Sequence, residues 1–323
     1  MNTVHTDFQN KIPVIYSDDY NIHFFGFEKL HPFDTGKYRK AYKYLRKNLN
    51  LSKSDFYKPD EVSENLLYSV HTKEYISSLK NSSNIARIAE MPVLQYLPSF
   101  ILNSSILRPM RIAAGGSVLA ADLALKKGIA INLSGGYHHA KSDGGGGFCF
   151  YSDIAIAVHS IWQKNNKIKV LIVDLDAHQG NGHEAILGND PRVDILDIYN
   201  KDIYPGDKKA EQFIDFNYPV PSRISETEYI TIVENSLEKA LLSNQYNLLI
   251  YNAGTDIYKS DPLGQMNISE AGIIKRDDIV FSLAQKNSVP ILILLSGGYT
   301  KESGLIIGKS IENLIKKNLK NFH

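Results

Sequence analysis

The stretch VLIVDLDAHQGNGHE, from Val170 to Glu184, gives the strongest indication of both fold and chemistry in this sequence. Five of its first six residues are apolar, which is typical of a strand buried on both faces of a parallel sheet. Asp174, Asp176 and His178 then stand at every second position. In an extended segment such residues share one face, so the end of a buried strand carries three potential metal ligands.

Similar short apolar segments recur along the chain and alternate with helical patterns. Strands are expected at 129–133, 170–175, 193–198, 248–251 and 291–295. Helices are expected at 153–164, 225–243, 268–286 and 302–318, and the second of these opens with the capping box Ser225-x-x-Glu228. The alternation predicts one α/β domain, a mostly parallel, doubly wound sheet flanked by helices. We expect the domain to include residues 1–323, with a core at about 14–314.

The first hundred residues have less regular patterns. Residues 35–48 and 63–80 are expected to be helical, whereas residues 91–100, which are apolar and include two prolines, are expected to form a loop.

Composition and charge narrow the class of protein. The chain has 36 Lys and Arg against 35 Asp and Glu, a net charge of +1, so direct nucleic-acid binding is not expected. One cysteine, Cys149, excludes a disulfide framework and a cysteine-based zinc site. The sequence shows neither a signal peptide nor a segment approaching the ~18 apolar residues of a membrane-spanning helix. A cytoplasmic protein is expected, with a nuclear location or delivery to another cell left open.

Polar loops containing glycine follow four of the predicted strands. They are SGGYHHAKSDGGGGF from Ser134, DAHQGNGHE from Asp176, NAGTDIY from Asn252 and SGGYT from Ser296. Open parallel sheets bind ligands at the carboxyl ends of their strands. Carboxylates buried together without a cation are costly, so the acids of these loops, with Asp256 among them, predict a site for zinc, manganese or iron. The alternative is that the acids cap loops and His178 is a polar core residue.

Two further groups suggest what such a metal site does. His138 and His139 follow two glycines, and histidine is the usual general acid or base near neutral pH, so the pair beside a metal favours hydrolysis. Tyr299 also follows two glycines, where a phenol can reach a substrate oxygen. Taken alone, none of these residues distinguishes a functional role from a structural one.

Together these segments resemble the zinc-dependent histone deacetylase family, within the arginase/deacetylase fold. The resemblance is carried by GGYHHAKSDGGGGFC, DLDAHQGNGHE, YNAGTDIYKSDPLG and SGGY, in that order, and extends over about 14–314. Four other segments, EKLHPFD, VHTKEY, IYPGD and AGIIKRDD, are similar to the class IV branch of the family.

The resemblance implies a role for each residue of the site. The ligands of one zinc ion would be Asp176, His178 and Asp256. Asp174 would orient His138, which tunes the electrostatics, and His139 would be general base and then general acid. Tyr299 would donate to the amide oxygen. Behind His139 many members have an aspartate, whereas this chain has Asn181, which puts the intrinsic rate in doubt.

The resemblance also implies a substrate channel and a second cation. The substrate-binding residues would be Gly147, Phe148, Tyr204, Leu263, Gly297 and Gly298, with the last two giving Tyr299 room to move. A potassium site would be built largely of backbone carbonyls, at Asp174, Asp176, His178, Asp197 and Ile198. A structural role is expected for His31, His71 and His183.

The implied function is a lysine deacylase that hydrolyses Nε-acyl-lysine, acetyl or long-chain, to lysine and a carboxylate. Partners would be acyl-lysine proteins or peptides, with histones among them. Small acylated amines are left open as further substrates. Residues 91–100 are a hypothetical lining for a longer acyl pocket. The alternatives are an acetylpolyamine amidohydrolase, a two-manganese ureohydrolase, against which Asn181 and the paired histidines argue, and a scaffold that binds acyl-lysine without turnover. The physiological substrate and the oligomeric state stay open.

Overall fold

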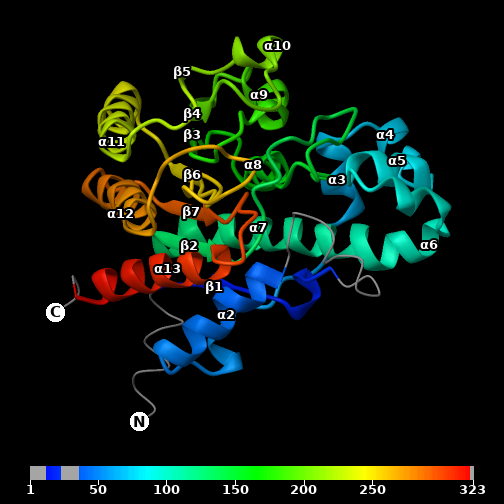
Figure 1. Cartoon of the computed structure of the whole chain (residues 1–323), viewed down its shortest axis with the longest axis horizontal. Coiled ribbons are helices and arrows are strands. Elements are labelled where there is room, and N and C mark those ends of the chain that lie inside the picture. Colours follow the sequence, from blue (N-terminus) through cyan, green and yellow to red (C-terminus); the bar gives the residue numbers. More distant parts are fainter. Residues whose placement is uncertain (1–11, 23–35, 321–323) are drawn as a thin grey trace.

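A seven-stranded sheet forms the centre of the computed structural model, which describes residues 12–22 and 36–320. The strand order is β1-β2-β7-β6-β3-β4-β5, and every pair of neighbours is parallel (Figure 1). The strands are β1 Val14–Ile15, β2 Ile129–Asn132, β3 Val170–Asp174, β4 Val193–Asn200, β5 Phe216–Val220, β6 Leu248–Asn252 and β7 Ile291–Leu294. The predicted α/β domain with a parallel sheet is confirmed.

The five predicted strands all exist, and their observed ends differ by at most two residues from the prediction. They occupy the middle of the sheet, and every residue in them is buried, which explains their continuous apolar sequences. The two strands that the sequence did not indicate, β1 and β5, lie at the edges. β1 has only two residues, and β5 is half exposed and contains Pro219, which is tolerated at a sheet edge.

The longer helices form two groups with the sheet between them (Figure 1). In one group α7 (Arg108–Lys127) packs against β2, β7 and α8 (Asp153–Lys164), and α8 contacts α9 (Asn181–Leu187). In the other, four helices pack in series: α2 (Gly36–Asn48), α13 (Ser303–Lys320), α12 (Glu270–Lys286) and α11 (Glu226–Ser243). The capping box prediction is confirmed in part, because the Ser225 hydroxyl accepts from the backbone N–H of Glu228.

Shorter elements connect these helices and strands. They are α3 Glu64–Val70, α4 Lys73–Ser78, α5 Ser82–Ile88, α6 Ser99–Leu102, α10 Lys208–Glu211, the 3₁₀ helices η1 Asp18–Tyr20, η3 Lys53–Asp55 and η4 Pro92–Tyr96, and the π-helical turn η5 Asn103–Leu107. The helical segment 63–80 is divided at His71 because Thr72 caps a new helix, its hydroxyl accepting from Tyr75 N at 3.1 Å. The expected loop at 91–100 is wrong, since η4 and the start of α6 occupy most of it.

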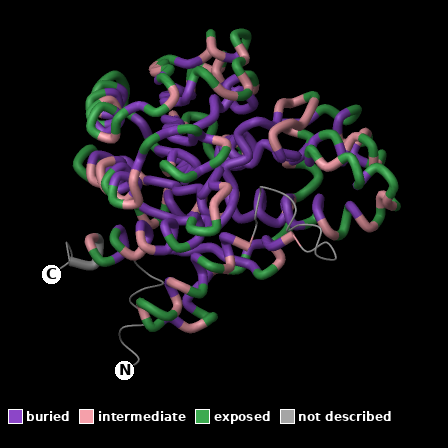
Figure 2. Tube along the Cα trace, viewed as in Figure 1, coloured by how far each residue is buried: buried purple, intermediate pink, exposed green. Residues whose placement is uncertain are grey.

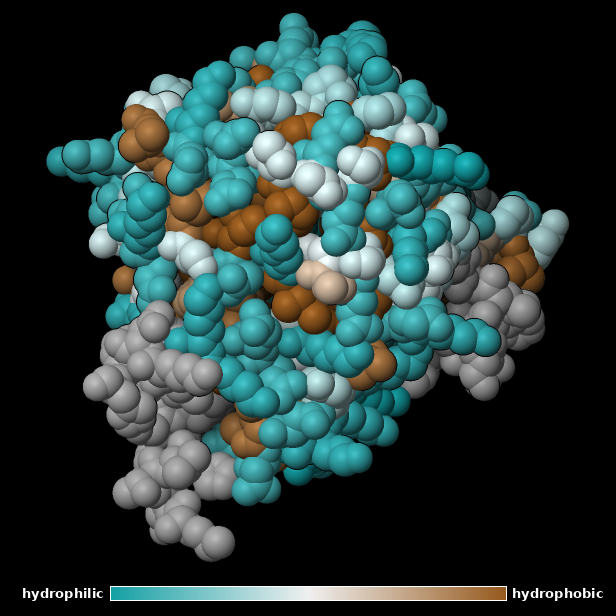
Figure 3. Space-filling model, turned by 60° about the vertical axis from the view of Figure 1, so that its left-hand side comes forward, coloured by the Kyte–Doolittle hydropathy of each residue, from teal (hydrophilic) through white to brown (hydrophobic). Residues whose placement is uncertain are grey.

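The core follows the sheet and the inner faces of both helix groups, and exposed residues lie on the outer faces (Figure 2). Figure 3 shows a face that is largely hydrophilic, with hydrophobic side chains gathered toward its centre. Large apolar side chains that remain exposed include Val93, Tyr96 and Phe100 around η4 and α6. Within the described residues, no helix combines the length and the apolar character needed to cross a membrane.

Candidate metal and catalytic site

The four polar loops singled out from the sequence follow four adjacent strands, β2, β7, β6 and β3. Because all four strands are parallel, their carboxyl ends lie at one edge of the sheet. The strand ends are in register there, with Asn252 beside both Asp174 and Leu294. The loops therefore meet above the middle of the sheet.

Asp176, His178 and Asp256 form one buried cluster. One potential ligand atom from each lies within 4.8 Å of the others, and the residues are between 0% and 5% exposed. The Nδ1 atom of His178 is 3.0 Å from Oδ1 of Asp176 and 3.0 Å from Oδ2 of Asp256. Oδ1 of Asp256 also accepts a hydrogen bond from the backbone, from Ala177 N at 2.9 Å.

The electrostatics of this cluster favour a bound cation. Burial and the charge of Asp176 raise the pKa of Asp256 to about 7. Burial opposes ionisation of Asp176 too, but His138 and His178 lower its pKa well below the usual range. Two carboxylates and an imidazole, closely packed and out of water, are a donor set that suits zinc, and a divalent charge would relieve the repulsion between the two acids.

His138 lies beside this cluster and is backed by a carboxylate. Its Nδ1 is 2.9 Å from Oδ2 of Asp174, the last residue of β3, and its Nε2 is 3.7 Å from Asp176. Burial lowers the pKa of His138, but the charges of Asp174 and Asp176 raise it to about 9. The loop that carries both histidines is anchored by Asp153, whose carboxylate accepts from Gly136 N at 3.0 Å and Tyr137 N at 2.7 Å.

His139 is backed by an amide instead. Its Nδ1 is 2.9 Å from Oδ1 of Asn181, the first residue of α9. Burial and the neighbouring histidines His138 and His178 lower the pKa of His139 well below its ordinary value. Gly147 lies against the ring: a Cβ there would be 2.4 Å from Cδ2 of His139, so this position leaves no room for a side chain.

The loop that carries Tyr299 is held at nearly every peptide group. Oδ2 of Asp176 accepts from Gly297 N at 2.8 Å, and Asp261 accepts from Tyr299 N at 2.7 Å. From α2, the buried Lys37 donates from Nζ to Ser296 O at 2.6 Å. Burial raises the pKa of the Tyr299 phenol well above 10, so it stays protonated and can donate a hydrogen bond.

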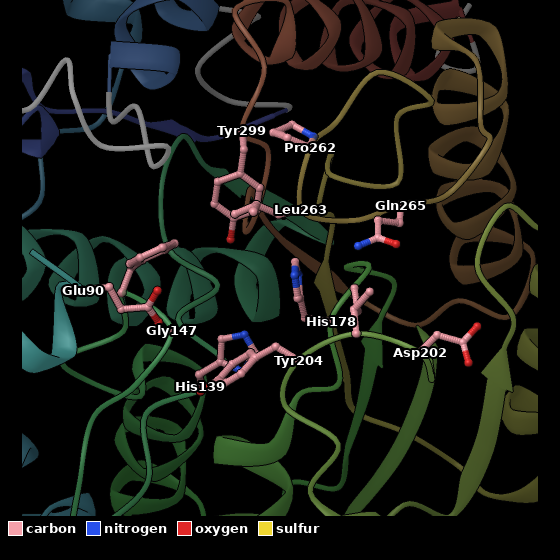
Figure 4. Close-up of a pocket in the computed structure, with 12 residues that line it drawn as sticks. Glu90, His139, Gly147, His178, Asp202, Tyr204, Pro262, Leu263, Gln265 and Tyr299 are labelled. Carbon is pink, nitrogen blue, oxygen red and sulfur yellow. The ribbon is translucent and has the colours of Figure 1, made fainter.

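A cavity of about 310 Å³ opens between these groups. Figure 4 shows Tyr299 and His139 on opposite sides of it, with His178 between them. Among the described residues its lining is Glu90, His139, Gly147, Phe148, His178, Asp202, Ile203, Tyr204, Pro262, Leu263, Gln265 and Tyr299. The sequence did not indicate Glu90 or Asp202. Ile203, Pro262 and Gln265 are neighbours in sequence of Tyr204 and Leu263, which is the only signal that pointed to them.

One expectation about the pocket needs correction. No residue of 91–100 lines the described cavity, and Val93, Tyr96 and Phe100 are exposed. Gly298 is not among the residues that line this cavity, and a Cβ there would be 2.1 Å from Thr255 Oγ1. Gly297 lines a smaller neighbouring cavity together with His139 and Tyr299, and a Cβ there would be 2.4 Å from Oδ2 of Asp256. Close packing is one reason for glycine at both positions, and the expectation that they give Tyr299 room to move stays a prediction.

The remaining residues named from the sequence lie around this site. Asp174, the last residue of β3, pairs in register with Asp197 inside β4, and both are fully buried. Ile198 follows Asp197 in the same strand. His71 bonds through Nδ1 to Lys141 O and through Nε2 to Ser152 N, both at 3.0 Å. His183 is fully buried. The segment EKLHPFD, with His31, lies outside the described residues.

Comparison with known proteins agrees with this fold. The family model of the histone deacetylase domain matches residues 31–315. Histone deacetylase 2 of Arabidopsis thaliana is 44% identical over 310 residues, which are 96% of this chain and 80% of that protein. Among solved structures, the HD domain of HDA15 covers 97% of this chain and is itself covered to 89%, with a TM-score of 0.76 and 21% identity.

A second solved structure, a histone deacetylase homologue complexed with SAHA, aligns with a TM-score of 0.74 and 22% identity over 96% of this chain and 89% of that one. At these identities the solved structures establish the fold. The match of the family model over most of the sequence establishes more: this chain belongs to the histone deacetylase family. It is accordingly a zinc-dependent amidohydrolase.

Proposed function

We propose that the chain hydrolyses the amide bond of Nε-acyl-lysine, releasing lysine and a carboxylate, and that Asp176, His178 and Asp256 hold its zinc ion. The observation that carries the proposal is one cavity of about 310 Å³ that is lined by His139, Tyr299 and His178. His178 belongs to the buried cluster of three potential ligands, with Asp176 and Asp256 behind it. When bound, zinc would polarise the substrate carbonyl and acidify water.

The residues of the chain then divide the proton transfers between them. His139, with a lowered pKa and a neutral amide behind it, takes a proton from the attacking water and returns it to the departing lysine amine. Tyr299 donates its phenolic hydrogen to the oxygen on which negative charge develops. His138, backed by Asp174, keeps positive charge beside the site, and Phe148 and Tyr204 flank the acyl-lysine chain.

The decisive experiment compares substrates on the purified, zinc-loaded protein. Zinc content is measured first, and kcat/KM is then determined for acyl-lysine peptides from acetyl to myristoyl. We expect one zinc per chain and turnover of at least one acyl-lysine series. A zinc-replete protein without turnover, in which Tyr299→Phe changes nothing, would instead favour the scaffold alternative. A clear preference for acetyl would remove the proposal of a long-chain substrate, which no residue of 91–100 now supports.

A second candidate function is the hydrolysis of small acetylated amines. Its support is the charge of the rim: the lining of the described cavity includes two carboxylates, Glu90 and Asp202, and neither lysine nor arginine. Such a rim attracts cationic substrates. Acetylpolyamines are therefore included beside the peptides, and a higher kcat/KM for them would replace lysine side chains as the preferred substrate.

Four further assignments are proposals of the same kind. The class IV branch is supported by VHTKEY, IYPGD and AGIIKRDD, and a phylogenetic tree of the family would test it. A potassium ion at Asp174, Asp197 and Ile198 would offset the repulsion that, together with burial, raises the pKa of Asp197. Thermal unfolding in potassium against sodium buffers would test it. A catalytic domain with its core at about 14–314 and a cytoplasmic location are testable by limited proteolysis and by cell fractionation.

A further inference from the structure

The side-chain hydrogen bonds that begin at His139 continue past Asn181 to two further residues. Nδ2 of Asn181 donates to Oδ2 of Asp207 at 3.2 Å. Lys141 donates to the same oxygen from Nζ at 2.5 Å. Asp207 ends the segment IYPGD, whose Tyr204 lines the cavity but whose aspartate has no part in the chemistry described so far. His139, Asn181, Asp207 and Lys141 therefore form one connected series.

The carboxylate of Asp207 decides which way round the Asn181 amide lies. Burial opposes the ionisation of Asp207, but the hydrogen bonds from Lys141 and Asn181 lower its pKa to about 2. An ionised carboxylate only accepts hydrogen bonds, so it must face the NH₂ group of Asn181. The amide oxygen of Asn181 then faces His139, and since that oxygen also only accepts, Nδ1 of His139 must carry the hydrogen.

We propose that Asp207 is a positioning residue which, through Asn181, holds His139 in the tautomer with hydrogen on Nδ1 and a free lone pair on Nε2. This inference rests on the proposed function, in which Nε2 of His139 is the atom that takes up the proton. In the opposite tautomer that atom is already protonated and cannot act as a base.

The need for Asp207 follows from the amide at position 181. A carboxylate there would accept from Nδ1 whichever of its oxygens faced the ring. An amide has two different ends, and its wrong end would select the wrong tautomer of His139. Asp207 selects the correct orientation of the Asn181 amide. Lys141, two residues after His139, keeps the carboxylate of Asp207 in place.

Asp207→Asn is the most informative substitution. The other oxygen of Asp207 caps α10, accepting from Lys209 N at 3.1 Å and Ala210 N at 3.2 Å, and Asn is as good a cap as Asp. The variant should therefore fold. Its new NH₂ would take the place of Oδ2 and meet two other donors, on Asn181 and Lys141, which favours a turn of the Asn181 amide and the wrong tautomer of His139.

For this variant we expect kcat to fall roughly 10- to 100-fold, as is typical for partners of active-site groups. KM should change by less than about two-fold, because the substrate-lining side chains are untouched. The matched control is Asp190→Asn, at a surface turn where Asp190 pairs with Arg192, and its kcat should equal that of the wild type.

A double-mutant cycle separates positioning from general damage. In the background Asn181→Ala there is no amide to orient, so adding Asp207→Asn should change kcat by less than about three-fold. An equal loss in both backgrounds would overturn the inference.

The tautomer itself is measured by ¹⁵N NMR of the imidazoles in the metal-free protein, with the His139 signals assigned by their loss in His139→Gln. We expect hydrogen on Nδ1 in the wild type and on Nε2 in Asp207→Asn, and an unchanged spectrum would also overturn the inference. If the spectrum switches as expected while the zinc-loaded wild type hydrolyses no acylated amine, the proposed function fails and the positioning role of Asp207 stands.

Discussion

His138 and His139 are joined by one peptide bond, yet their surroundings shift their pKa values in opposite directions. On the side of His138 the partner is the buried carboxylate of Asp174, and the pKa of His138 is raised to about 9. On the side of His139 the partner is the amide of Asn181, and the pKa of His139 is lowered. The comparison shows that the partners at the end of β3 and the start of α9, rather than the loop that carries both histidines, decide which of them is charged and which is a base.

Replacing the two histidines in turn gives the largest expected difference between the two sides. His139→Gln removes the base, so we expect kcat/KM to fall roughly 10³-fold, within the range for general acid–base catalysis. His138→Gln removes only a charge and should cost roughly ten-fold less than that. Both variants are assayed at matched zinc content. Equal losses in the two variants would contradict the division of roles.

A glycine substitution tests how tightly the His139 side is packed. The Cβ of Gly147→Ala would collide with the His139 ring and would sit at a positive φ of 50°. We expect kcat to fall by about 100-fold, the cost of displacing a catalytic group by an ångström, with zinc content unchanged. Gly144→Ala is the control, because nothing lies within 4 Å of its Cβ position, and it should retain wild-type activity.

A carboxylate behind His139, like the one behind His138, should reduce the difference between the pKa values of the two histidines. In Asn181→Asp a negative charge would favour the protonated ring of His139 and raise its pKa. The base must be unprotonated to work, so the acid limb of the kcat pH profile should move to higher pH by the same amount. At pH values above that limb, activity should be retained. An acid limb that stays in place would mean that another group controls it.

His71 is an imidazole with a backbone partner at each nitrogen, and its substitution should affect turnover least. Burial lowers its pKa to about 4 in the folded chain, against 6.5 for the free side chain. Between these values the unfolded chain binds more protons, so the free energy of unfolding falls as the pH is lowered from 6.5 toward 4, by roughly 2 kcal/mol at pH 5.

His71→Gln should remove this dependence while leaving kcat at pH 7 nearly unchanged. Denaturant unfolding of both proteins at pH 7 and pH 5 measures it, and a parallel decline in the two proteins would exclude His71 as the cause.

The sequence predicted the central strands and the residues that gather above them because both depend on local pattern. Strands buried on two faces have continuous apolar sequences, and polar residues after parallel strands must meet at one edge. Edge strands lack this signal. The sequence did not predict α7, because glycine inside a helix weakens the helical pattern. Gly115 is required there by packing, since a Cβ would be 1.9 Å from the carbonyl oxygen of Asp60.

The supporting contacts of the site could not be predicted, because they join residues that are distant in sequence. Lys37 and Ser296 are 259 positions apart, Asp261 and Tyr299 are 38 apart, and Asn181 and Asp207 are 26 apart. None of these pairs leaves a periodic pattern. The spatial order of β2, β7, β6 and β3 could not be predicted from the sequence either. This order places the four polar loops beside one another.

Arg276 of α12 extends the site into the helix layer. Its guanidinium is fully buried and donates from Nη1 to the carbonyl oxygens of Leu175 and Gly254, at 3.0 and 2.6 Å. Leu175 immediately precedes Asp176, and Gly254 is two residues before Asp256. One side chain of α12 thus holds together the backbone that precedes two of the carboxylates. The spacing of the metal cluster therefore depends on a helix that contributes no residue to the lining of the described cavity.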